Sequence, residues 1–254
     1  MRTDILEMLD SYEANREASM FPEPETGALD FGLPLTEKHR PQRVLDFIGI
    51  QDAKAIFANL IKRPRPCALL LLGAPGLGKT TLSLAFAKEL NAGLIKVDSG
   101  QLTVDRVADI RDKIQYFPPT GEFWVVLCDE ADRMSPAAQV ALLSALDSAN
   151  VLKPKFGGGF EQGAPLPVIW VFTANGKGET QTEAPDGLTA RFIQRCLTVK
   201  FPPVNGEMAG WIAQVWERET GEPMPAGRAQ SVATEASGSP REALQRLDLE
   251  LLKR

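Results

Sequence analysis

One short segment, residues 73–80, has the residue types and spacing of a phosphate-binding loop. It reads Gly-Ala-Pro-Gly-Leu-Gly-Lys-Thr and matches G-x-x-x-x-G-K-[ST]. The segment follows the apolar run 68–72 and opens an amphipathic stretch, which is where such a loop must lie. Its glycines let backbone N–H groups point at phosphate oxygens, and the helix N-terminus adds a favourable dipole. We expect Lys79 to contact the β- and γ-phosphates and the Thr80 hydroxyl to bind Mg²⁺.

Two adjacent carboxylates, Asp129 and Glu130, end another apolar run, residues 123–128. In a parallel sheet, ligands bind at the carboxyl ends of the strands, so both acids should face the phosphate loop. Asp129 would hold Mg²⁺ through its water shell, and Glu130 would orient and polarise an attacking water. The pair alone is also typical of an ordinary turn. Together with the loop it predicts phosphoryl transfer, in which placement and charge neutralisation do most of the work.

Four more polar residues are candidates for contact with a nucleotide. Asn175 ends the apolar run 168–174 and could sense the γ-phosphate, although an asparagine that begins a loop has the same pattern. Arg191 and Arg195 precede the last apolar run, and their guanidinium groups suit bidentate phosphate contacts. Either arginine could equally be a surface ion-pair partner. Arg241 lies in the first turn of the last predicted helix, where a cation is unfavourable unless an anion is near.

The elements that must position these residues alternate between apolar runs and amphipathic stretches. Continuous apolar strands that alternate with helices indicate a parallel sheet covered on both faces. Ser135 and Pro136 have the residue types of an N-cap and a first helical position. The expected strands are 68–72, 94–97, 124–128, 168–172 and 197–201, and the expected helices are 80–90, 104–116 and 136–149. Three short helices, 206–220, 226–237 and 239–253, should form a small second domain.

Composition excludes several other classes of protein. The 254 residues carry 28 basic and 33 acidic side chains, a net charge of -5, so a uniformly basic nucleic-acid-binding surface is excluded. The three cysteines (Cys67, Cys128 and Cys196) are too far apart for a zinc site of short spacing. The single histidine, His39, argues against histidine-rich metal sites and histidine-dependent hydrolases. No apolar run approaches membrane-spanning length and the N-terminus lacks a signal-peptide pattern, so we expect a cytoplasmic protein without membrane contact.

Several motifs together resemble those of AAA+ ATPases, and most of all the clamp-loader subunits of the replication factor C and bacterial gamma type. Residues 35–41 (L-T-E-K-H-R-P) and 46–50 (D-F-I-G-I) are similar to the segments that line adenine in that family. Residues 129–134 (D-E-A-D-R-M) and 138–142 (A-Q-V-A-L) resemble its acidic motif and the helix that follows. Residues 238–244 (G-S-P-R-E-A-L) resemble its sensor-two segment. The resemblance implies a P-loop α/β fold with a five-stranded parallel sheet, followed by a helical lid.

The family resemblance also assigns roles to residues. It implies that Asn175 is sensor one and Arg241 is sensor two. The arginine finger has two candidates: Arg195 fits the family's S-R-C motif with Gln194 in place of serine, whereas Arg191 fits the L-x-x-R-F of Holliday-junction branch-migration motors. We favour Arg191, because Arg195 lies close to the following strand.

The predicted site consists of catalytic residues, Mg²⁺ ligands and ATP contacts. The catalytic residues are Glu130, Asn175, Arg191 and Arg195, and the Mg²⁺ ligands are Thr80 and Asp129. The predicted ATP contacts are Arg40, Pro41, Ile48, Gly73, Ala74, Pro75, Gly76, Leu77, Gly78, Lys79, Thr80, Thr81 and Arg241.

The domain organisation predicted is an N-terminal arm (1–30), a nucleotide-binding α/β domain (31–202) and a helical lid (203–254). The chain stops after the sensor-two segment, so we expect neither a clamp-loader collar nor a winged helix. The insertion at residues 151–163 is longer than in clamp loaders, and its part from Lys153 to Phe160 is the candidate DNA contact. Lys153, Lys155, Phe156 and Phe160 have a composition that could contact DNA, and a glycine-rich loop without partner is the alternative.

The function predicted from these features is MgATP hydrolysis by an oligomer of this chain, or of this chain with related AAA+ subunits. Hydrolysis would load or remodel a macromolecule, in a clamp-loader-like role in DNA replication or recombination. An ATP-dependent assembly switch that acts on a partner protein through residues 1–30 is a different hypothesis. A protein remodeller is a third, although residues 97–104 contain no aromatic pore-loop pattern.

Overall fold

The computed structural model describes residues 32–147, 153–154, 160–161, 166–177 and 182–253. The chain divides into two units, residues 1–33 and 34–254, and every element below belongs to the second. The N-terminal arm predicted over residues 1–30, as well as Lys155 and Phe156, lies outside the described residues.

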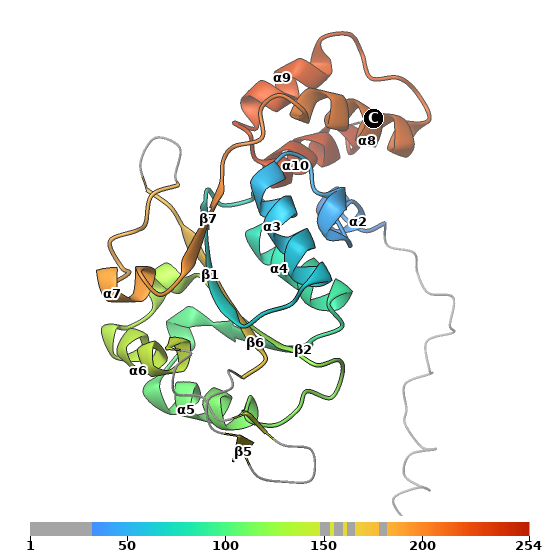
Figure 1. Ribbon diagram of the computed structural model, residues 1–254. Coiled ribbons are helices and arrows are strands. Elements are labelled where there is room, and N and C mark those ends of the chain that lie inside the picture. The colour runs from blue at the N-terminus through green and yellow to red at the C-terminus, as the bar shows by residue number, and fades with distance from the viewer. Residues whose placement is uncertain (1–31, 148–152, 155–159, 162–165, 178–181, 254) are drawn as a thin grey trace, which may run out of the picture. The chain divides into compact units, whose positions relative to one another are not determined.

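A five-stranded parallel sheet forms the centre of the second unit, in the order β2-β3-β6-β1-β7 (Figure 1). Its register pairs Gly73 of β1 with Asn175 of β6, and Cys128 of β3 with Phe172 of β6. The ends of β1, β3 and β6 therefore lie at the same edge of the sheet, and the prediction of a five-stranded parallel sheet is confirmed. The strands are β1 (Cys67–Gly73), β2 (Gly93–Asp98), β3 (Trp124–Asp129), β6 (Val168–Asn175) and β7 (Leu197–Phe201).

Helices cover both faces of this sheet, as the continuous apolar strands predict. Because side chains alternate along a strand, Leu69 and Leu71 of β1 belong to one apolar cluster, and Leu70 and Leu72 belong to another. The first cluster includes helices α3 (Gln51–Lys62) and α4 (Lys79–Glu89). The second includes α5 (Val104–Lys113), α6 (Pro136–Leu146) and the short α7 (Ala190–Ile193). Single 3₁₀ turns lie at Val44–Asp46, Ser99–Gln101 and Ala131–Arg133.

Helix α3 is absent from the sequence-based prediction. Its buried residues Ala53, Phe57 and Leu60 recur at helical spacing, and this is the signal that could have identified it. Helices α5 and α6 are also shorter than predicted. Helix α6 begins as expected, because the Ser135 side chain accepts a hydrogen bond from the Ala138 N–H, but it ends at Leu146.

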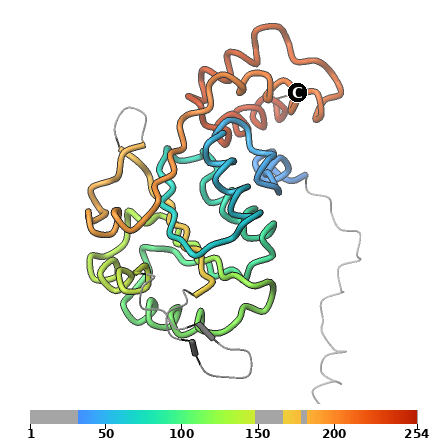
Figure 2. Tube along the Cα trace, viewed as in Figure 1, coloured from blue at the N-terminus to red at the C-terminus, as the bar shows by residue number. Residues whose placement is uncertain are grey.

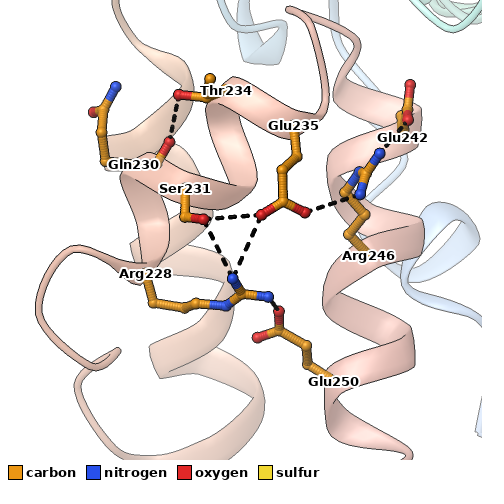
Figure 3. A network of polar contacts seen from close by, with 8 residues as sticks. All are labelled: Arg228, Gln230, Ser231, Thr234, Glu235, Glu242, Arg246 and Glu250. Atoms are coloured by element: carbon orange, nitrogen blue, oxygen red, sulfur yellow. Dashed lines mark hydrogen bonds and ion pairs between the residues drawn. The ribbon is translucent and has the colours of Figure 1, made fainter.

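Three helices follow β7: α8 (Met208–Thr220), α9 (Arg228–Glu235) and α10 (Pro240–Leu251). Met208, Ile212, Val232 and Leu247 are fully buried in an apolar cluster of their own. Charged side chains join α9 to α10, as Figure 3 shows. Arg228 of α9 pairs with Glu250 of α10, and Glu235 of α9 pairs with Arg246 of α10. Arg228 also pairs with Glu235 within α9, and Arg246 with Glu242 within α10.

A one-turn helix, α2 (Leu35–Lys38), lies against α10 although it is far away in the sequence (Figure 2). Leu35 is 3% exposed and belongs to the apolar cluster of the three C-terminal helices. Residues near the start of the described chain therefore pack against the helices near its end.

Two short antiparallel strands, β4 (Lys153–Pro154) and β5 (Phe160–Glu161), pair within the insertion. Lys153 pairs with Glu161, and Pro154 pairs with Phe160. Antiparallel pairing therefore joins residues 153–154 to residues 160–161. In the described ranges, no helix has both the length and the apolar character needed to cross a membrane.

Candidate functional site

The glycine-rich loop lies between β1 and α4, at the carboxyl edge of the sheet. Gly76 and Gly78 have φ angles of 82° and 86°, in the left-handed region that side chains other than glycine rarely adopt. Gly73 lies so close to Phe201 that an added Cβ would come within 2.6 Å of its backbone oxygen. The loop can therefore curl tightly, and α4 begins at Lys79 with free N–H groups at its N-terminus.

Lys79 is a buried cation inside this loop, with 8% of its surface exposed. Its Nζ donates to the carbonyl oxygens of Gly73 and Ala74 at 2.7 and 2.9 Å, and to Asn175 Oδ1 at 3.4 Å. Burial lowers the pKa of Lys79 to about 8, although the charges of Asp132 and Asp129 partly offset this. A lysine that is desolvated in this way is suited to an anionic ligand, which would stabilise its charged form.

Thr80 and Asp129, the two predicted Mg²⁺ ligands, lie side by side. Thr80 Oγ1 donates to Asp129 Oδ1 at 2.7 Å, and Thr173 Oγ1 donates to the same oxygen at 2.5 Å. The sequence analysis did not identify Thr173 as a site residue. A polar residue inside the apolar run 168–174 is the signal that could have identified it. The described residues contain no cluster of three or more His, Cys, Asp or Glu that could hold a metal ion. Two oxygen donors fit Mg²⁺ well, because it usually keeps waters and takes further ligands from phosphate.

Glu130 follows Asp129 in a left-handed conformation, with φ 54° and ψ 52°. This conformation is uncommon for glutamate, and the neighbouring structure must hold it in place. The Glu130 N–H donates to Thr173 Oγ1 at 3.1 Å, which ties the turn to β6. Arg133 Nη1 donates to Glu130 Oε2 at 2.6 Å, whereas Oε1 makes no hydrogen bond to the described residues. One carboxylate oxygen of Glu130 is thus available to a water molecule.

Asn175 is fixed on both sides at the end of β6. Its N–H donates to Asp132 Oδ1 at 3.2 Å, and its side-chain oxygen accepts the contact from Lys79. Asp132 was not singled out from the sequence, although its spacing after Asp129 places it on the same turn. Five polar side chains, from the ends of two strands and the start of one helix, therefore meet at this edge: Lys79, Thr80, Asp129, Glu130 and Asn175.

A pocket of about 300 Å³ lies beside the loop. One wall comes from the loop and α4, and another comes from residues 36–48 and the helices α8 and α10. The predicted contacts that line it are Arg40, Pro41, Ile48, Gly76, Leu77, Gly78, Thr81 and Arg241. The Arg241 N–H also donates to the Gly76 carbonyl at 3.4 Å. The other predicted contacts (Gly73, Ala74, Pro75, Lys79 and Thr80) belong to the loop and α4 but do not line the pocket. His39, Trp211 and Gln245 line it without having been predicted.

The two candidate finger arginines lie away from this pocket and differ in their contacts. Arg195 donates from Nε to Asp147 Oδ1 at 2.7 Å and from Nη2 to Asp147 Oδ2 at 3.2 Å. Its Nη1 also donates to the Arg191 carbonyl. The guanidinium group of Arg191, on α7, is exposed and makes no polar contact with the described residues.

Residues 69–196 match the model of a protein family described as "ATPase family associated with various cellular activities (AAA)". The matched range is half of the chain and contains the whole glycine-rich loop, the acidic pair and Asn175. The chain belongs to this AAA family of ATPases. The sequence-based prediction of an AAA+ ATPase is thereby confirmed.

Curated relatives agree with the clamp-loader resemblance. The chain is 37% identical over 123 residues to replication factor C subunit 2 of Arabidopsis thaliana, a match that covers 45% of this chain and 37% of that protein. It is 36% identical over 127 residues to replication factor C subunit 5 of Mus musculus, covering 45% of this chain and 37% of that protein. The matches thus span little more than a third of these relatives.

Solved structures show the same fold. The RuvB Holliday junction branch migration motor of Thermotoga maritima superposes with a TM-score of 0.58 at 20% identity, covering 81% of this chain and 63% of that one. A point mutant of the same motor gives a TM-score of 0.60 at 19% identity, covering 81% and 64%. At this identity the likeness shows the fold alone.

Replacing Gly76 with alanine should disturb this AAA site through the backbone. At φ 82° a side chain is strained by about 1–3 kcal/mol, and the new Cβ would lie 2.4 Å from Ser239 Oγ. We expect the free energy of unfolding to fall by about that amount and ATP affinity to fall about tenfold, measured by urea unfolding and calorimetry. Gly210→Ala on α8 is the control, because an added Cβ there meets nothing within 4 Å. Equal ATP affinity in the two variants would contradict the placement of Gly76 at the site.

Proposed function

We propose that this AAA protein binds and hydrolyses MgATP and, as a subunit of an oligomer, uses hydrolysis to load or remodel a macromolecule in DNA replication or recombination. The observation that carries the proposal is the convergence of Lys79, the Thr80–Asp129 pair and Glu130 at one edge of the sheet, beside a pocket of nucleotide size.

Each residue at this edge has a separate role in the proposed reaction. The N–H groups of the loop and Lys79 bind the β- and γ-phosphates, and Thr80 and Asp129 hold Mg²⁺. Bound Mg²⁺ would neutralise charge that develops on the phosphoryl oxygens. Glu130 uses its free oxygen to orient and polarise the attacking water. Asn175, held between Lys79 and Asp132, positions that water near the γ-phosphate.

The pocket suits the nucleoside half of ATP. Arg40, Pro41 and Ile48 form the wall that would contact adenine and ribose. Arg241 approaches from α10, opposite Gly76, so its cation would reach the phosphates as the three C-terminal helices close as a lid. The partly apolar, partly cationic lining agrees with a ligand that has an aromatic base and a charged tail.

An oligomer would complete the site. Arg191 is an exposed arginine without a partner among the described side chains, and such a group can stabilise transition-state charge in a neighbouring subunit. Both this chain and related AAA subunits are candidate neighbours.

A role on DNA is supported by the named relatives and by the insertion. Lys153 and Phe160 lie on the paired strands β4 and β5, and a hairpin of this composition could contact a nucleic-acid backbone. The net charge of -5 confines such contact to a small surface. Residues 1–30 remain a candidate docking segment for a partner protein.

The test is ATP hydrolysis by the purified chain with and without primed DNA and a sliding clamp. We expect DNA with the clamp to increase kcat several-fold, because the ligand orders the oligomer. Lys79→Ala serves as the background control. Hydrolysis that does not respond to DNA or clamp would contradict the DNA role and favour the assembly switch.

A further inference from the structure

Residues 35–39, which precede α3 and the sheet, contact the C-terminal helices at several points. Leu35 is buried among them, and its N–H donates to Asp248 Oδ2 of α10 at 3.2 Å. On α8, Glu219 accepts from Lys38 Nζ at 2.6 Å and from His39 Nε2 at 2.7 Å. Both oxygens of this one carboxylate are therefore used to hold α2.

The contact between His39 and Glu219 is largely shielded from water. The two side chains are 12% and 11% exposed, whereas Lys38 is 54% exposed. Burial raises the pKa of Glu219, but the bonds from Lys38 and His39 outweigh it, and the net shift is downward. Glu219 is therefore an anion at neutral pH, with a shielded partner and an exposed one.

The same segment forms a wall of the nucleotide pocket. His39, Arg40 and Pro41 line it together with Trp211 of α8 and residues 244 and 245 of α10. The opposite wall is the phosphate loop. Glu219 thus joins two distant parts of the chain into one side of the pocket, although Glu219 itself is not among the lining residues.

We propose that Glu219 is a positioning residue that makes α2 and the C-terminal helices one jaw over the nucleotide, and that its contacts with Lys38 and His39 slow nucleotide release. The proposal rests on the proposed nucleotide site. It predicts that release depends on a residue that is outside the catalytic edge of the sheet.

The charged groups near this contact leave Glu219 as the link to α8. Lys38 and His39 both donate to it. Of the other charged groups nearby, Glu37 and Arg40 pair with each other at 2.6 Å, and Asp248 of α10 accepts the Leu35 N–H. Asp46 and Arg241 line the same pocket. Because Glu219 is ionised, its two hydrogen bonds are charge-assisted and stronger than bonds to a neutral amide.

The experiment measures the release of Mg²⁺ and fluorescent N-methylanthraniloyl-ADP from the full chain. Glu219→Gln should release the nucleotide about tenfold faster than the parent, because a neutral amide loses the charge-assisted bonds to Lys38 and His39. His39→Gln should also release it faster than the parent, because the shielded bond to Glu219 is weakened.

The matched control is Glu217→Gln, on the same helix, whose side chain is exposed and makes no polar contact with the described residues. It should behave as the parent does. A Glu219→Gln protein with the parent's release rate would overturn the proposal.

A second readout separates this inference from the proposed nucleotide site. Without nucleotide, the backbone amides of residues 34–41 should exchange hydrogen faster in Glu219→Gln than in Glu217→Gln, with the sheet unchanged. Equal exchange would overturn the positioning role even if ADP binds. Failure of the parent to bind ADP would instead refute the nucleotide site.

Discussion

Glu130→Gln should reduce kcat for ATP hydrolysis by about 10²–10⁴-fold, while ATP binding is retained. The glutamine amide has nearly the same shape but cannot take a proton from water, and its charge no longer polarises the nucleophile. Binding should persist because Lys79, Thr80 and Asp129 make their contacts independently of the Glu130 carboxylate. Steady-state hydrolysis and calorimetric titration with ATP measure the two effects separately.

Glu122→Gln is the matched control for this substitution. Glu122 is an exposed residue before β3 that makes no polar contact with the described residues. Its glutamine variant should hydrolyse ATP at the parent rate. Parental hydrolysis by Glu130→Gln, with the protein folded and bound to ATP, would show that another group activates the water.

Arg191→Ala should reduce ATP hydrolysis by about 10³–10⁵-fold in the assembled oligomer, with ATP binding unchanged. The reason is that Arg191 is exposed and unengaged by the described residues, whereas Arg195 is held by both oxygens of Asp147. An arginine that must reach a neighbouring subunit has to be free of such a contact. Mixing Arg191→Ala with Lys79→Ala protein should restore activity, since each supplies the group that the other lacks.

Arg195→Ala separates the two candidates. The substitution removes the guanidinium group that donates to both oxygens of Asp147. We therefore expect lower stability of the region around α7 and only a small effect on kcat. A large loss of kcat in Arg195→Ala, with little loss in Arg191→Ala, would reverse the assignment. Absence of rescue in the mixture, with both proteins folded, would argue against action in trans.

Local motifs predicted which polar side chains meet at the carboxyl edge of the sheet. The glycine-rich loop and the acidic pair each lie within one short segment, so spacing alone defines their geometry relative to the next strand or helix. The five strands were also predicted, with bounds within a few residues of those observed. The central strands β1, β3 and β6 are buried apolar runs, whereas the edge strands β2 and β7 also carry exposed side chains. Helix α3 was missed although Ala53, Phe57 and Leu60 recur at helical spacing.

By itself, the sequence determined which residue types can bind phosphate and Mg²⁺, and that they lie at the carboxyl edge of a parallel sheet. Only the tertiary structure decided which distant residues support them. Thr173 and Asp132 hold the acidic turn and Asn175, Asp147 engages Arg195, and Glu219 fastens His39 from 180 positions away. Contacts of this kind leave no periodic or spacing signal, because they depend on how separate elements pack. The candidate catalytic groups are thus encoded locally, whereas the contacts between residues 35–39 and the C-terminal helices are a product of the packing.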